Sequence, residues 1–231
     1  SVKDLDQAYS KNVKGLILCS PSNPTGSVYT LAELKAIAEW AKANAVWIIS
    51  DEIYRRINYG PAPAPSMLDL PDELLERTCL VYGASKAYAM TGWRIGAVLS
   101  PPHVAKAIAA LQSHTTTGAN HPAQWAAAAA FSDERVEQDV VRMVAAFRRR
   151  RDHLVERFRN EAPGVEFVEP HGAFYFFFRV DGVQAGEPLE VGARPGGVAP
   201  VEAVVDDAHA GQSGARAGAS SHPRWGRRSA S

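Results

Sequence analysis

Two short apolar runs with a helical pattern between them constrain the fold of this chain most strongly. Residues 14–20, KGLILCS, predict a buried strand that ends at the turn-rich sequence PSNPTG. Thr30 and Glu33 have the spacing of a capping box, and apolar residues then recur at helical intervals to about Asn44. Residues 45–50, AVWIIS, predict a second buried strand. This order predicts a βαβ unit, whose crossover favours parallel strands and an α/β fold.

Two more strands are predicted at residues 78–82 and 94–100, and the pattern turns helical from residue 101. We therefore expect a large domain over residues 1–131, built as a mixed, mainly parallel sheet with flanking helices.

A long interdomain helix is predicted over residues 132–162, with Ser132 as its N-cap and acidic residues in its first turn. About 28 residues at about 1.5 Å each would span about 42 Å, which is enough to join two domains. Residues 163–182 contain two runs, VEFVEP and AFYFFFRV, that predict paired strands at the start of a small α+β domain.

Residues 183–231 consist largely of Gly, Ala, Arg, Ser and Pro and keep no apolar periodicity. Such a segment cannot bury enough surface to offset its ordering entropy. A natural disordered tail and an out-of-frame reading of a GC-rich gene both explain it, and the coding DNA would distinguish them. Because the chain begins at Ser1 and not at Met, we expect a fragment.

Charge and cysteine content exclude several classes of protein. Lys and Arg total 25, as do Asp and Glu, so no net field favours nucleic acid or a membrane surface. Cys19 and Cys79 are isolated, and the His residues lack metal-ligand spacing, which argues against a disulfide framework or a metal site. No apolar stretch reaches the roughly 18 residues of a membrane span. We expect a cytoplasmic protein with a small-molecule partner.

Polar residues follow the predicted strands: Asn23, Asp51 and Lys86 each lie just beyond a strand end. Ligands of open parallel sheets bind beyond the carboxyl ends of the strands, so we expect these three side chains to converge. A lysine in such a place can serve as a nucleophile when burial and a neighbouring cation activate it.

Three motifs carry a resemblance to a known family. SPSNPTG (20–26), SDEIY (50–54) and GASKAYAMTGWRIG (83–96) resemble successive signatures of the class I aminotransferases, which are pyridoxal-phosphate enzymes of fold type I. The third is most similar to the bacterial aspartate or aspartate/prephenate aminotransferases. The resemblance extends from residue 1 to about Gly182 and includes GAFYFF. It implies that pyridoxal 5'-phosphate serves the transfer of an amino group between an aspartate- or glutamate-like amino acid and a 2-oxo acid.

The resemblance also implies roles for individual residues. Lys86 would hold the cofactor aldehyde and then move the proton between the substrate Cα and the cofactor. Asp51 would pair with the pyridine nitrogen, since a nearby carboxylate favours its charged form. Asn23 and Tyr54 would bond the phenolic oxygen of the ring.

Three further assignments follow from the same resemblance. Arg94 would clamp the cofactor phosphate bidentately with help from the Ser85 hydroxyl, and Phe174 would line the substrate pocket. A homodimer is expected, because sites of this family are shared across a subunit interface. The family's upstream phosphate-binding helix start and stacking aromatic, and its downstream carboxylate-binding arginine, have no counterpart in the chain. We therefore expect impaired activity.

Alternatives stay open for the single motifs and for the activity. NPTG alone is more often a simple turn. WIISDE alone could be a Walker B strand, with Asp51 and Glu52 at a magnesium nucleotide site, although no P-loop motif is present. The same residues would also serve another fold type I enzyme, such as a β-lyase or decarboxylase, and a non-catalytic remnant is a third possibility.

Overall fold

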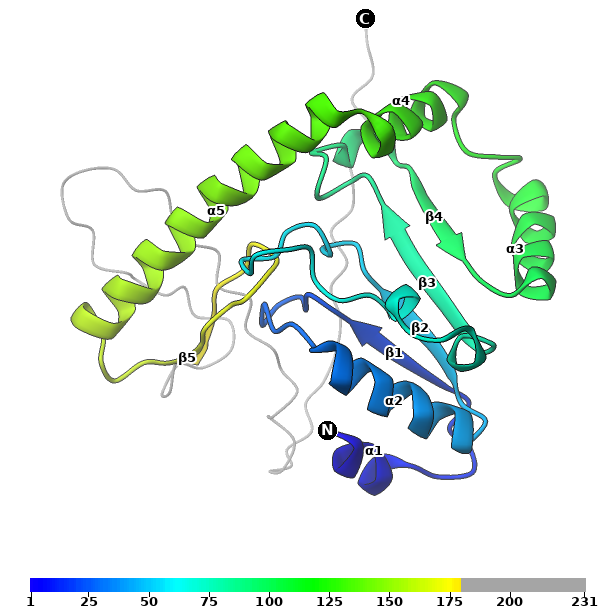
Figure 1. Ribbon diagram of the computed structural model, residues 1–231, viewed down its shortest axis with the longest axis horizontal. Helices are drawn as coiled ribbons and strands as arrows, with labels where there is room; N and C mark the ends of the chain where they lie inside the picture. Colours follow the sequence, from blue (N-terminus) through cyan, green and yellow to red (C-terminus); the bar gives the residue numbers. More distant parts are fainter. Residues whose placement is uncertain (180–231) are drawn as a thin grey trace, which may run out of the picture. The chain divides into compact units, whose positions relative to one another are not determined.

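The predicted βαβ unit is confirmed. In the computed structural model, which describes residues 1–179, β1 (Gly15–Cys19) leads through α2 (Leu31–Ala43) to the parallel strand β2 (Trp47–Asp51) (Figure 1). A short helix, α1 (Val2–Ala8), precedes β1. It is tied to α2 by a 2.7 Å hydrogen bond that Trp40 Nε1 donates to Asp6 Oδ1.

The start of α2 has the predicted capping box. Thr30 Oγ1 accepts a 3.2 Å hydrogen bond from the Glu33 amide, and the Glu33 carboxylate accepts one of 2.8 Å from the Thr30 amide. Both bonds satisfy backbone donors that the first helical turn leaves without partners, so this end of the helix is fixed locally.

The sheet is mixed and mainly parallel, as predicted. Its order is β1-β2-β3-β4, with β3 (Thr78–Gly83) parallel to β2 and β4 (Gly96–Leu99) antiparallel to β3. Cys19, Asp51 and Val81 are aligned across β1, β2 and β3. The carboxyl ends of the three parallel strands therefore meet at one edge of the sheet.

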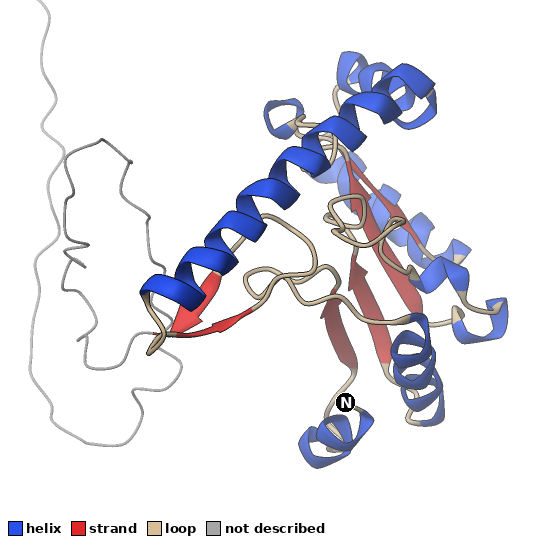
Figure 2. Cartoon of the chain, turned by 60° about the vertical axis from the view of Figure 1, so that its left-hand side comes forward, coloured by secondary structure: helices blue, strands red, loops and turns tan. Residues whose placement is uncertain are grey.

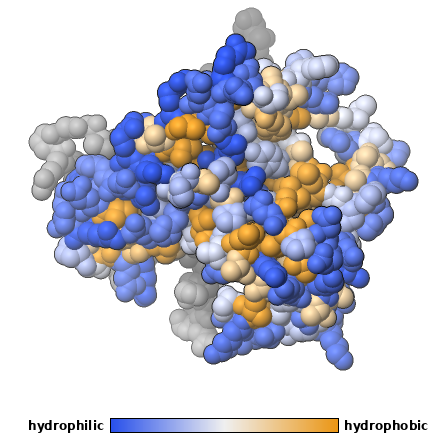
Figure 3. Space-filling view, in the orientation of Figure 1, coloured by the Kyte–Doolittle hydropathy of each residue, from blue (hydrophilic) through white to orange (hydrophobic). Residues whose placement is uncertain are grey.

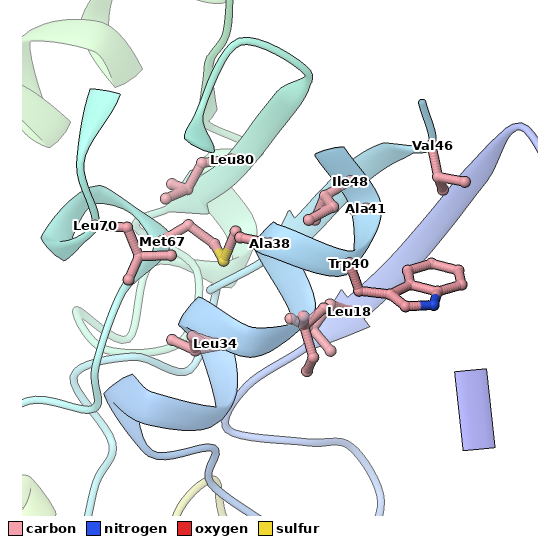
Figure 4. Close-up of a cluster of buried hydrophobic side chains, with 11 residues drawn as sticks. Leu18, Leu34, Ala38, Trp40, Ala41, Val46, Ile48, Met67, Leu70 and Leu80 are labelled. Atoms are coloured by element: carbon pink, nitrogen blue, oxygen red, sulfur yellow. The ribbon is translucent and has the colours of Figure 1, made fainter. Parts of the chain in front are cut away.

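One face of the sheet packs against α2 to form the core. Leu18, Ile48 and Leu80 point from the strands toward Leu34 and Ala38 of the helix, and all five are buried (Figure 4). Apolar residues at every second position of the strands pack against apolar residues three or four positions apart on the helix. These spacings place the apolar side chains on one face of each element.

The opposite face of the sheet is more open. Ile17 of β1 is 75% exposed, and Ile49 of β2 and Val98 of β4 are each 42% exposed. Figure 3 shows apolar areas among polar ones on the face of the chain that is seen there. Mainly parallel sheets usually have helices on both faces, so the described residues cover this sheet incompletely.

Loops and helices follow the sheet strands. The Pro-rich loop contains the 3₁₀ turns η1 (Met67–Asp69) and η2 (Asp72–Leu74), and η3 (Thr91–Trp93) precedes β4. Beyond β4 come α3 (Pro102–Thr115) and α4 (His121–Ser132).

The long helix is present as α5 (Glu134–Glu161) with 28 residues (Figure 2). Its predicted N-cap was wrong: Ser132 is the last residue of α4, and Asp133 caps α5 by accepting a 2.8 Å bond from the Arg135 amide. Asp is as good a cap as Ser, and only the preceding helix decides between them. Among residues 1–179, no helix has both the length and the apolar character of a membrane span.

Two strands follow α5, as predicted. β5 (Glu166–Val168) pairs antiparallel with β6 (Phe177–Arg179). The predicted domain boundaries stay predictions, and the predicted tail at 183–231 lies outside the described residues.

Candidate active site

The segment between β5 and β6 lies across the loops that follow β1 and β2. The amides of His171 and Gly172 each donate a 2.9 Å hydrogen bond to the carbonyl of Gly26, in the loop after β1. The amide of Ala173 donates a 2.8 Å bond to the carbonyl of Ile57, in the loop after β2. In Figure 1 the yellow segment accordingly reaches the blue and cyan loops. Three stretches far apart in sequence are thus joined by backbone bonds.

Close approach at this junction depends on Gly172. A Cβ atom at this position would lie 2.7 Å from the Pro21 ring and 2.9 Å from the Ile57 carbonyl. Both neighbours are rigid, so only glycine lets the segment lie this close to the two loops.

The junction brings three predicted site residues together. Lys86 Nζ lies 5.8 Å from the ring centroids of both Tyr54 and Phe174. The two rings meet edge to face, with centroids 5.3 Å apart. Tyr54 is 3% exposed and Phe174 is 39% exposed. The lysine therefore sits among aromatic faces that favour a cation, on a surface that a ligand can reach.

Tyr175 belongs to the same group, although it is not among the site residues predicted from the sequence. Its hydroxyl oxygen lies 2.6 Å from that of Tyr54 and accepts a 3.2 Å hydrogen bond from Asn23 Nδ2. We call Asn23, Tyr54, Lys86, Phe174 and Tyr175 the aromatic cluster. Burial raises the pKa of Tyr54, and its hydrogen bond to Tyr175 raises it further, so the phenol keeps its proton at neutral pH.

Asp51 lies at the edge of the sheet beside this cluster. It is the last residue of β2, and its Oδ1 accepts a 3.1 Å bond from the Ile53 amide, which orients the carboxylate. Cys19, the last residue of β1, is its partner on the adjacent strand. Burial raises the pKa of the Cys19 thiol, and the Asp51 charge adds to this effect. The carboxylate thus supplies negative charge at the carboxyl ends of the strands.

Glu52 has a different place from Asp51. It is 2% exposed, and its Oε1 accepts bonds of 3.1 Å from Ser50 Oγ and 2.9 Å from the Met67 amide. The bond from the Met67 amide ties the start of η1 to the end of β2. The carboxylate points into the protein, so the structure does not support the Walker B interpretation, in which both acidic residues would face a magnesium nucleotide.

Arg94 bonds to its own 3₁₀ turn. Its Nη1 donates a 3.1 Å bond to the Thr91 carbonyl, and its backbone is left-handed at φ 51°. It lines a hollow of about 770 Å³ together with Gln112, Thr116 and Asn120. In the part of the chain that the structure describes, no side chain of the aromatic cluster lines this hollow. Ser85 is half-buried and directly precedes Lys86.

The chain matches the model of a known protein family. The model for class I and II aminotransferases matches residues 1–191. The chain belongs to the class I and II aminotransferase family.

Individual relatives agree with this assignment. The aspartate aminotransferase of Streptomyces avermitilis is 42% identical over 177 residues, which are 77% of this chain and 43% of that protein. The probable aspartate/prephenate aminotransferase of Aquifex aeolicus is 41% identical over 77% of this chain and 45% of its own length. A solved structure of a Thermus thermophilus aspartate aminotransferase double mutant has a TM-score of 0.68 at 38% identity, covering 76% of this chain and 45% of that one. The chain thus spans less than half the length of these relatives.

Proposed function

We propose that this chain carries the cofactor-binding lysine of a pyridoxal-phosphate-dependent aminotransferase. Enzymes of this family use pyridoxal phosphate in general. The proposed reaction moves an amino group between an aspartate- or glutamate-like amino acid and a 2-oxo acid. The names of the relatives, which are aspartate and aspartate/prephenate aminotransferases, support this substrate class. The observation that carries the proposal is the position of Lys86 beside Tyr54 and Phe174.

The donor set fits the proposed cofactor. Asn23 Nδ2 and the Tyr54 hydroxyl both lie within hydrogen-bond distance of one phenolic oxygen, that of Tyr175. In this place the Tyr175 hydroxyl stands in for the ring hydroxyl of pyridoxal phosphate, which is also a phenol-type oxygen. Two donors that converge on such an oxygen, next to a lysine amine, match the hydroxyl and aldehyde of that ring. When bound, the cofactor supplies a positively charged ring that withdraws electrons from the bonds at the substrate Cα.

Lys86 would act in two ways at this site. Its Nζ would hold the cofactor through the aldehyde carbon of the ring. The amine would also serve as the general base that takes the proton from the substrate Cα. One group would therefore serve as anchor and as base.

The other residues would orient and tune the ring. Asp51 would keep the ring nitrogen protonated, because its negative charge favours the cationic form. Asn23 and Tyr54 would donate to the ring oxygen, and Phe174 would contact the substrate. Arg94 and Ser85 would bind the phosphate.

Assembly and location complete the proposal. We propose a homodimer and a cytoplasmic location, on the basis of the family and the absence of a membrane-spanning helix among residues 1–179. Since the chain spans less than half the length of its relatives, we expect it to transaminate slowly by itself.

A single-turnover assay tests the function. The chain is mixed with pyridoxal phosphate and aspartate or glutamate, and we expect the matching 2-oxo acid in an amount that does not exceed the bound cofactor. Lys86→Ala should produce none, whereas Lys106→Ala, which removes an exposed lysine of α3, should behave as the wild type. Cleaved side-chain fragments or carbon dioxide in place of the oxo acid would favour a β-lyase or decarboxylase. Bound cofactor without any turnover would favour a non-catalytic remnant.

A further inference from the structure

The Tyr175 hydroxyl contacts both side chains that would bind the ring oxygen of the proposed cofactor. Tyr54 Oη lies 2.6 Å from Tyr175 Oη, and Asn23 Nδ2 donates to the same oxygen at 3.2 Å. The two donors come from the loops after β2 and β1, and they meet on a residue that lies 121 and 152 positions further along the chain, respectively. The Tyr175 hydroxyl therefore reaches Tyr54 and Asn23 through a tertiary contact between distant parts of the chain.

The geometry of the contact makes it exclusive. The Tyr175 oxygen lies 2.6 Å from the Tyr54 oxygen and 3.2 Å from Asn23 Nδ2. A second oxygen that bonded both side chains at such distances would have to lie in the place of the Tyr175 oxygen. A ligand whose phenolic oxygen binds Tyr54 and Asn23 must therefore first displace the oxygen of Tyr175.

We propose that Tyr175 is an internal competitor of the cofactor: its hydroxyl occupies the place of the cofactor's ring oxygen in the free chain and leaves when the cofactor binds. This inference rests on the proposed function. It makes Tyr175 a residue that sets the affinity of the site, with no part in the chemical step.

The surroundings of Tyr175 allow this exchange. The backbone is anchored on one side by the Ala173 amide, which donates to Ile57, and on the other by β6, which begins at Phe177. Tyr175 lies between these two points and is half-buried, and its neighbour Phe174 is 39% exposed. The hydroxyl can therefore leave by rotation of one side chain, while the anchored junction stays in place.

Tyr175→Phe tests the competition. The substitution keeps the ring, whose centroid lies 5.8 Å from that of Tyr54, and removes only the hydroxyl. Displacing the native hydroxyl costs a net hydrogen bond or two, so we expect the variant to bind pyridoxal phosphate about fivefold to tenfold more tightly. Tyr9→Phe is the matched control, because Tyr9 packs against Trp40 in another cluster, and its dissociation constant should equal that of the wild type.

An analogue of pyridoxal phosphate without the ring hydroxyl tests where the Tyr175 oxygen lies. If this oxygen occupies the place of the ring oxygen, the ring carbon of the analogue would come within bonding distance of it, so the analogue must displace Tyr175 as well. The analogue should therefore also bind Tyr175→Phe more tightly than the wild type. No gain for the analogue would overturn the proposal, as would unchanged or weaker binding of the cofactor by Tyr175→Phe.

The small ligand 3-hydroxypyridine separates this inference from the proposed function. It has the ring hydroxyl but neither aldehyde nor phosphate, so its binding requires neither Lys86 nor Arg94. If pyridoxal phosphate fails to attach while 3-hydroxypyridine binds Tyr175→Phe more tightly than the wild type, the inference stands and the proposed function falls. If 3-hydroxypyridine also binds no more tightly to the variant, the inference falls.

A measurement on the wild type keeps the proposal testable if Tyr175→Phe does not fold. Tyrosine ring signals are followed by NMR while 3-hydroxypyridine is added to the full chain. We expect the signals of Tyr175 to shift and those of Tyr9 to stay. Unchanged Tyr175 signals at saturating ligand would overturn the proposal.

Discussion

Replacing Gly172 with alanine should break the junction that builds the site. The new Cβ would lie 2.7 Å from the Pro21 ring and 2.9 Å from the Ile57 carbonyl, whereas carbon atoms pack at about 3.5–4.0 Å. The contact must open by about 1 Å, and neither a proline ring nor a backbone carbonyl can rotate away. Overpacking of this kind costs about 1–3 kcal/mol, and losing the bond from the Gly172 amide to Gly26 adds about 1 kcal/mol.

Urea denaturation measures this cost, and Gly164→Ala is its control. A Cβ at Gly164, in the turn between α5 and β5, would meet nothing within 4 Å, so its free energy of unfolding should change by less than about 0.5 kcal/mol. Gly172→Ala should lose about 2–4 kcal/mol of stability. Equal stability of the two variants would refute the steric account of the junction.

The remaining predictions concern α2 and the thiol beside Asp51. Thr30→Ala should lower the free energy of unfolding by about 1 kcal/mol in urea, since it removes one half of the capping box, and an unchanged midpoint would contradict this. The hydrogen bonds from Thr30 hold the pKa of Glu33 below its usual value of 4.5. The contribution of the Glu33 carboxylate to stability is therefore present above pH 4.5 and is lost as the pH falls through the lower pKa of the folded chain. Between these two pH values, Glu33→Gln should lose less stability on acidification than the wild type. Burial raises the pKa of Cys19, so iodoacetamide should label this thiol more slowly in the folded chain than in urea at neutral pH, and equal rates would contradict the burial.

Local patterns were sufficient to predict most of the elements. The strands β1, β2 and β3 and the helix α2 were expected within a few residues of their bounds, because apolar periodicity and the Thr30 capping box act over one or two turns. The N-cap of α5 was predicted one residue too early. Ser132 and Asp133 are both good caps, and the choice depends on where α4 ends.

The site was predictable only in part, for a physical reason. Strand ends indicated Asn23, Asp51 and Lys86, since the carboxyl ends of parallel strands share an edge. No sequence pattern indicated Tyr175 as a partner of Asn23 and Tyr54, because this contact requires the β5–β6 segment to lie across two distant loops. Such a contact depends on backbone bonds at Gly26 and Ile57, which no local pattern encodes. The position of Arg94 in a separate hollow was equally unpredictable from its spacing to Lys86.

The central claim is that Lys86 is the residue that binds the cofactor covalently. The chain is incubated with pyridoxal phosphate, reduced with borohydride, digested and mapped by mass spectrometry. We expect one dominant modified peptide, which contains Lys86, and its loss in Lys86→Ala. Comparable labelling of Lys106 and other exposed lysines, with no preference for Lys86, would contradict the account.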